Sequence, residues 1–158
     1  MNLDLENFLP YRLHRIAGVL SNRARDVYRR KHRLTVPEWR VLATLGQFGR
    51  LTASRIGRHS AMHKTKVSRA VAALEERRWL VRETNETDRR EEFLTLTKSG
   101  RSAYEEIVPD LAGFETALKE RLGEASSRDL LAGLEKLEAV LLGPGRASNA
   151  RQGRTGEG

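Results

Sequence analysis

The order of the elements predicted between Thr35 and Thr97 constrains the fold more than any other feature. Capping residues and apolar periodicity predict three helices, at residues 35–45, 52–58 and 63–77. The segment Gly46 to Gly49 is expected to end the first of them. Two short predicted strands follow, at residues 79–84 and 93–97. A polar loop at residues 85–91 separates them. Three helices followed by a hairpin are typical of a winged helix.

Long amphipathic helices are predicted on both sides of this region, at residues 10–31, 98–121 and about 127–142. Pro10 suits a first helical turn, Pro109 is expected to kink the second helix, and the segment Ser126 to Asp129 resembles a capping start for the third. The apolar stripes of these helices are too long to be covered within one small chain. We therefore expect a homodimer.

The predicted fold is mainly α with a small β-hairpin wing, namely a winged helix-turn-helix plus a helical dimerisation region. We place the winged helix-turn-helix at residues 34–98, and the dimerisation region at residues 1–33 and 99–142. Residues 143–158 are rich in Gly, Ser, Asn and Arg and are expected to form a disordered tail.

The distribution of charge favours a polyanionic partner. The chain carries a net charge of +8, and Lys and Arg release the counterions that condense on phosphate backbones. The segment from Arg55 to Arg69 holds five basic residues and two histidines but no acid. A charge run is usually a solvated face, but this one coincides with the predicted helix-turn-helix. We therefore predict double-stranded DNA as the partner.

The helix from Lys64 to Arg77 is the predicted recognition element. Val67, Ala70, Val71 and Leu74 form a narrow apolar stripe, and small or basic residues occupy the other face. Small residues allow a close approach to a groove, and Arg to guanine is the commonest specific base contact. The predicted DNA-contacting residues in the helix-turn-helix are Thr52, Lys64, Thr65, Lys66, Ser68 and Arg69.

The hairpin loop adds Asp88, Arg89 and Arg90. Arginines at a wing tip can enter a narrow, A·T-rich minor groove, where negative potential is concentrated. Asp88 cannot usefully face a phosphate, so we expect it to hold an arginine side chain in position.

The residues that an enzyme, a metal site or a membrane protein would need are not evident in the sequence. There is no cysteine for thiolate catalysis, no Gly-rich phosphate loop and no plausible pair of carboxylates, so we expect no enzyme and no cofactor. His59 and His63 are four residues apart, but they straddle a predicted turn without a nearby Cys or Glu; phosphate contact or simple exposure is favoured over a metal site. Neither a membrane span nor a signal peptide is evident, so a cytoplasmic location is expected.

Three segments together resemble the MarR family, the multiple-antibiotic-resistance type of bacterial regulators. They are Leu34 to Leu42, Lys64 to Val71, and Asp88 to Arg90 followed by Leu94 to Gly100. The resemblance covers residues 10–142 and implies a triangular dimer that reads a palindromic site, with Arg90 in the minor groove. One departure is Arg78, which stands where the family usually has glycine and is expected to alter the helix end.

The resemblance also implies a repressor that is released from its operator by a small aromatic acid, phenol or thioester. Candidate effector-binding residues are Tyr11, His14, Arg15 and Trp39, since an arginine among aromatic rings suits an aromatic carboxylate. An amphipathic helix at a dimer interface would carry such residues in any case. Two other functions stay open: a nonspecific architectural DNA-binding protein and a helical protein-interaction adaptor.

Overall fold

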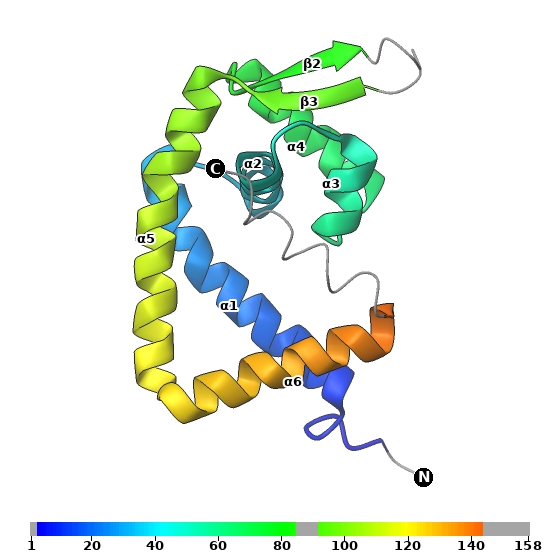
Figure 1. Cartoon of the computed structure of the whole chain (residues 1–158), viewed down its shortest axis with the longest axis vertical. Helices are drawn as coiled ribbons and strands as arrows, with labels where there is room; N and C mark the ends of the chain where they lie inside the picture. The colour runs from blue at the N-terminus through cyan, green and yellow to red at the C-terminus, as the bar shows by residue number, and fades with distance from the viewer. Residues whose placement is uncertain (1–2, 85–91, 144–158) are drawn as a thin grey trace, which may run out of the picture. The chain divides into compact units, whose positions relative to one another are not determined.

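The computed structural model describes residues 3–84 and 92–143, which form helices and one small sheet (Figure 1). In chain order the elements are α1 (Leu9–His32), α2 (Val36–Phe48), β1 (Leu51–Thr52), α3 (Ala53–His59), α4 (Lys64–Glu76), β2 (Leu80–Thr84), β3 (Glu92–Leu96), α5 (Lys98–Leu122) and α6 (Glu124–Leu142). The chain divides into two compact units, Met1–Leu111 and Ala112–Gly158. The predicted fold class, mainly helical with a small hairpin, is confirmed.

Local sequence explains both ends of α2. The Thr35 hydroxyl accepts a hydrogen bond from the Glu38 amide, and the Glu38 carboxylate accepts one from the Thr35 amide, which completes a capping box. The helix runs through Gly46, because a glycine inside a helix only weakens it, and ends within the predicted segment Gly46 to Gly49. The helix ends at Phe48, and Gly49 follows with a φ of 73°, a conformation that favours glycine.

The sheet has the antiparallel strand order β1-β3-β2. Strands β2 and β3 pair from Leu80 with Leu96 to Thr84 with Glu92. Strand β1, which the sequence analysis did not predict, pairs Leu51 with Leu94 on the far side of β3. This third strand ties the segment before α3 to the hairpin, so the hairpin is anchored at its base.

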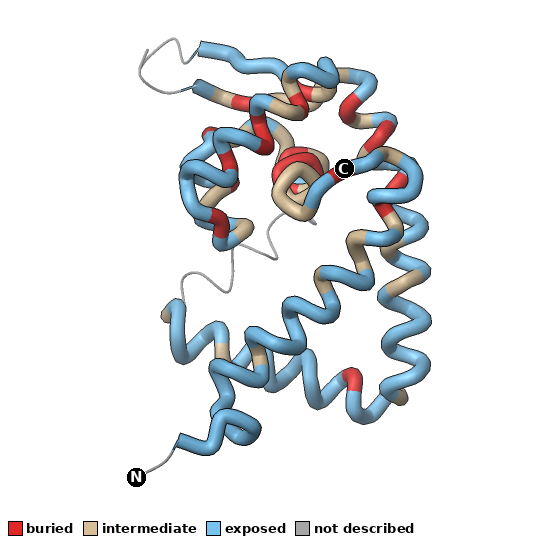
Figure 2. The backbone as a smooth tube through the Cα atoms, turned by 180° about the vertical axis from the view of Figure 1, so that it is seen from behind, coloured by how far each residue is buried: buried red, intermediate tan, exposed pale blue. Residues whose placement is uncertain are grey.

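The core of the first unit is built from α2, α3, α4 and the sheet, with Tyr28 from α1 and with Ala103 and Ile107 from the first half of α5. Figure 2 shows buried segments gathered there, whereas the first half of α1 is exposed. The fully buried side chains include Tyr28, Val41, Leu42, Leu45, Ile56, Val67, Val71, Leu74, Leu80, Leu94 and Ile107.

Three aromatic rings join α1, α2 and α5 within this unit. The Trp39 ring stacks on Tyr28 at a centroid distance of 5.4 Å and on Tyr104 at 6.2 Å. Gly46 faces Tyr104 so closely that a Cβ there would lie 2.6 Å from the ring. The absence of a side chain at Gly46 therefore makes room for the stack.

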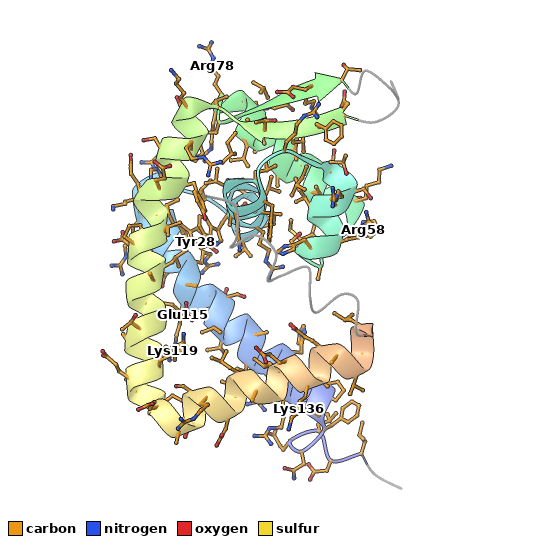
Figure 3. All side chains as sticks on the ribbon, in the orientation of Figure 1. Tyr28, Arg58, Arg78, Glu115, Lys119 and Lys136 are labelled. Atoms are coloured by element: carbon orange, nitrogen blue, oxygen red, sulfur yellow. The ribbon has the colours of Figure 1, made fainter. Side chains whose placement is uncertain are left out.

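The second unit contains the end of α5 and all of α6. Helix α6 starts at Glu124, and Gly123 precedes it with a φ of 85°. The predicted capping start at Ser126 to Asp129 is therefore wrong: Ser127 lies inside the helix, where its hydroxyl donates to the Lys119 carbonyl at 3.3 Å. On α5, Lys119 and Glu115 form an ion pair at 2.6 Å, and both are labelled in Figure 3.

Candidate nucleic-acid interface

Helices α3 and α4 meet through a tight turn that brings their backbones close together. The Met62 amide donates to the Gly57 carbonyl at 3.0 Å, and Ala61 between them has a φ of 50°. A Cβ at Gly57 would lie 3.1 Å from the Met62 carbonyl oxygen, so glycine fits this close approach. His63 then caps α4 by accepting from the Thr65 amide at 3.4 Å.

Helix α4 has one buried face and one exposed face, as its periodicity predicted. Val67, Ala70, Val71 and Leu74 are buried. The opposite face exposes all the residues that were predicted to contact DNA on this helix, namely Lys64, Thr65, Lys66, Ser68 and Arg69. The structure thus brings these five side chains together on one solvent-facing surface.

The exposed face of α4 is positively charged and uncompensated. The first turn of α4 contains no acid, and its N-terminus carries the positive end of the helix dipole. Within residues 3–84 and 92–143, no ion pair engages Lys64, Lys66 or Arg69. These cations are available to phosphate oxygens or base edges.

Two further cations on α3 were not among the predicted contact residues. Arg55 and Arg58 are both exposed, and Arg58 lies on the surface of α3 (Figure 3). The acid-free run from Arg55 to Arg69 was the signal that could have found them, since both belong to it.

Thr52 does not belong on this surface. Its side chain is only 5% exposed, and its hydroxyl accepts a hydrogen bond from the Arg55 amide at 3.3 Å as the cap of α3. Thr52 is therefore the buried member of the predicted contact residues in the helix-turn-helix, and its DNA contact stays a prediction.

Two arginines hold the base of the hairpin. Arg82 on β2 donates to Glu75 of α4 at 2.9 Å and to Glu92 of β3 at 2.8 Å, and these hydrogen bonds raise the pKa of its guanidinium. Arg50 pairs with Glu83 at 3.0 Å and lies 3.9 Å above the Phe93 ring. The predicted loop residues Asp88, Arg89 and Arg90 lie outside the described residues.

The C-terminal end of α4 keeps a left-handed residue although no glycine is present. Arg78 has a φ of 58°, the Trp79 amide donates to the Leu74 carbonyl at 2.9 Å, and the Arg78 amide donates to Glu75 at 2.7 Å. This is a Schellman ending with arginine at the left-handed position. The expected change in helix geometry is therefore absent, and the exposed Arg78 side chain projects outward (Figure 3).

The same helix end is attached to the end of α1. Arg77 donates to the backbone carbonyls of His32 at 2.7 Å and Arg33 at 3.3 Å. Its guanidinium also lies 3.8 Å from the Glu38 carboxylate. The recognition helix is thus bonded directly to the segment that links α1 to α2.

The two histidines of the predicted turn lie apart from any metal-ligand cluster. His59 contacts the Phe48 ring edge-on, and His63 is the α4 cap. Among the residues that the structure describes, no group of three or more His, Asp or Glu side chains is placed to hold a metal. No described helix is long and apolar enough to cross a membrane.

The predicted effector residues fall at two separate places in one chain. Tyr11, His14 and Arg15 are exposed near the start of α1, where Arg15 pairs with Glu6 at 2.8 Å. Trp39 stacks on Tyr28 instead, and Arg15 and Tyr28 are about 20 Å apart along the helix axis, at 1.5 Å per residue. A single chain does not bring the four residues together.

Residues 33–91 match a family model described as the MarR family. The regulator FarR of Neisseria gonorrhoeae is 29% identical over 111 residues, which are 68% of this chain and 76% of FarR. Two solved structures resemble the whole fold. The MarR family regulator SPO1453 of Silicibacter pomeroyi has 28% identity and a TM-score of 0.76, over 89% of this chain and 99% of its own.

The second structure is BpsR of Bordetella bronchiseptica, whose DNA binding is regulated by 6-hydroxynicotinic acid. It has 22% identity and a TM-score of 0.68, over 80% of this chain and 98% of BpsR. The matched segment contains the helix-turn-helix with its cationic α4 face, and the wider likeness extends to the flanking helices. Over residues 33–91 the chain is similar to the MarR family, and its wider similarity is to transcriptional regulators, among them FarR and SPO1453.

Proposed function

We propose that the protein is a sequence-specific repressor that binds a palindromic operator through α4 and the hairpin. The observation that carries this proposal is the exposed face of α4, on which three cations without an ion-pair partner in the described residues flank the small residues Thr65 and Ser68. Small side chains allow the helix to enter the major groove, and the flanking cations reach base edges or phosphates. No catalytic step is part of the proposal.

The residues divide into two kinds of contact. Arg69 lies on the small-residue face and is assigned to base edges together with Thr65 and Ser68. Lys64 and Lys66 lie on its flanks and are assigned to phosphates. In the hairpin loop, Arg89 and Arg90 are assigned to the minor groove and Asp88 to their support, on sequence grounds alone.

A homodimer supplies the second reading head. Large apolar side chains stay exposed at the start of α1, where Ile16 is 60% exposed and Val19 56%, and at the end of α6, where Val140 is 81% exposed and Leu141 71%. Exposed apolar surface of this kind marks an interaction site. We assign residues 1–33 and 99–142 to the dimer contact and residues 34–98 to DNA binding.

A small aromatic acid is the proposed effector. The partly buried rings of Trp39 and Tyr104, which stack beside the buried Tyr28, provide aromatic side chains between α2 and α5. Regulation of the similar protein BpsR by 6-hydroxynicotinic acid supports this ligand class. Tyr11, His14 and Arg15 would have to come from the second copy, since one chain keeps them away from Trp39. Such a ligand releases DNA only if it favours one spacing of the two heads.

Footprinting on the DNA that flanks the protein's own gene tests the proposal. We expect a protected palindrome whose half-sites lie one helical turn apart. Uniform protection would indicate an architectural protein, and no salt-dependent binding would indicate a protein-interaction adaptor; either result would reject the proposal. Sedimentation equilibrium at low micromolar concentration is expected to give twice the chain mass. A folded monomer under these conditions would reject the proposed homodimer.

A further inference from the structure

A basic groove lies between the end of α1 and the start of α2, away from the exposed face of α4. It has a volume of about 960 Å³. The last two turns of α1, the linker and the first turn of α2 line it, through Arg25, Asp26, Arg29, Arg30, Arg33, Leu34, Thr35, Val36 and Pro37. Four of these nine residues are arginines, and one is an acid.

The arginines of this groove have no carboxylate partner among the described residues, a property that they share with Arg69 of α4 and with other exposed arginines of the unit. Arg15, Arg50, Arg77 and Arg82 each lie within ion-pair distance of a glutamate. No such pair engages the four groove arginines in residues 3–84 and 92–143. Glu38, the acid at the start of α2, is already bonded to the Thr35 amide and lies beside Arg77.

One groove arginine also has a donor with nothing to bind. The Nε of Arg25 is buried and has no hydrogen-bond partner. A buried donor without a partner is costly, and such groups are usually satisfied by a bound water or ion. This donor is covered by the protein itself, so the case for a negatively charged ligand rests on the four groove arginines, which no carboxylate neutralises in the described residues.

The spacing of the arginines indicates how many charges the ligand carries. Arg25, Arg29 and Arg33 follow one another at intervals of four residues and span about 12 Å along the helix axis. One carboxylate binds one guanidinium group bidentately, and can contact at most two guanidinium groups. We propose that the groove binds a small molecule with at least two phosphate or carboxylate groups, whose apolar part lies against Val36 and Pro37.

The groove is directly connected to the recognition helix. Arg33 is one of the residues that line the groove, and its backbone carbonyl accepts a hydrogen bond from the Arg77 guanidinium at 3.3 Å, at the end of α4. Arg33 itself is held in a left-handed conformation with a φ of 51°. A ligand that draws the Arg33 side chain into the groove therefore changes the support of α4. The effect of the ligand on α4 matters only if α4 binds DNA, so it rests on the proposed function. Binding of the ligand to the groove does not.

Calorimetric titration of the full chain at constant ionic strength tests the binding. The probes are pyrophosphate for phosphate groups, citrate for carboxylates, and benzoate as a single charge. We expect pyrophosphate, citrate or both to bind, and benzoate to bind at least tenfold more weakly. The variant with Arg29→Gln and Arg30→Gln is expected to lose about tenfold or more in affinity for the bound probe.

The matched control carries Arg12→Gln and Arg23→Gln, which remove the same charge from exposed positions of α1 outside the groove. It is expected to bind the probe like the unaltered protein. Equal losses in both variants, equal binding of benzoate, or no binding of either polyanion would overturn the groove assignment.

DNA titrations with and without the bound probe test the regulation. We expect the probe to change DNA affinity in the unaltered protein but not in the Arg29→Gln and Arg30→Gln variant, which keeps the α4 cations and so controls for competition there. Arg77→Met should keep probe binding and lose the effect on DNA; an effect that persists would overturn this route. If the protein binds no DNA, the proposed function fails while the binding result stands.

Discussion

Arg82 of β2 and Glu75 of α4 form an ion pair in which the Arg82 Nε lies 2.9 Å from the Glu75 carboxylate. The same guanidinium reaches Glu92 of β3 at 2.8 Å. One side chain therefore bridges the recognition helix and both strands of the hairpin. Because the two elements proposed to contact DNA must be held in a fixed relation to meet adjacent grooves, this bridge is expected to affect binding as well as stability.

Arg82→Met is expected to lower the free energy of unfolding by about 0.5–1 kcal/mol, since the pairs are partly exposed to solvent. It should weaken DNA binding severalfold, because the hairpin loses its link to α4. Urea unfolding and fluorescence anisotropy on operator DNA measure the two effects. Arg12→Met, which removes an exposed charge elsewhere, is the control. If Glu75→Gln and Arg82→Met have additive effects in the double variant, the pair is not coupled.

Arg69→Ala and Lys66→Ala separate base contact from phosphate contact. Arg69→Ala should cost roughly 1–3 kcal/mol of binding free energy on the operator and relax preference at particular base pairs. Lys66→Ala should weaken operator and scrambled DNA alike and reduce the slope of log affinity against log salt by about 1. Titrations on both DNAs at several salt concentrations distinguish a base contact from a phosphate contact. Equal losses on both DNAs in both variants would contradict the assignment of α4.

Arg78→Gly is expected to raise the free energy of unfolding by about 1 kcal/mol. The residue sits at a φ of 58°, where a Cβ costs about that much and glycine costs nothing. Arg78→Ala keeps the Cβ and is the matched control, for which no gain is expected. Chemical denaturation of the three proteins measures the difference. A gain in the alanine variant as large as that in the glycine variant would point to the charge instead of the backbone.

Tyr28 is expected to stay protonated at alkaline pH. Burial raises the pKa of its phenol above the ordinary value of 10.0, although Arg25 and Arg40 act in the opposite direction. The unfolded chain ionises first, so stability is fully present below pH 10 and is lost as the pH rises through the folded pKa. Absorbance titration of the phenolate should show a late step that Tyr28→Phe removes. A titration curve unchanged by this substitution would be evidence against the shift.

The sequence predicted those parts of the molecule that depend on long apolar stripes. The bounds of α1 and α4 and the buried face of α4 followed from periodicity alone. Strand β1 could not be predicted, because two residues carry no periodic pattern and their partner β3 lies far along the chain. The burial of Thr52 could not be predicted for a related reason, because it depends on that sheet. The Arg82–Glu75 pair and the Arg77 bonds to the α1 end depend on tertiary packing, which no local pattern reveals.

Gly100, in the first turn of α5, lies against the backbone of Trp79 at the start of the hairpin. A Cβ at this position would overlap the Trp79 carbonyl oxygen, a contact with backbone that no rotamer change relieves. In a saturation library selected for DNA binding, position 100 should therefore return glycine alone. Position 113, where a Cβ would meet open space, should return many residues. The residue at the junction of the hairpin and α5 is thus restricted to glycine by backbone packing, and this restriction does not depend on which operator or effector a related protein binds.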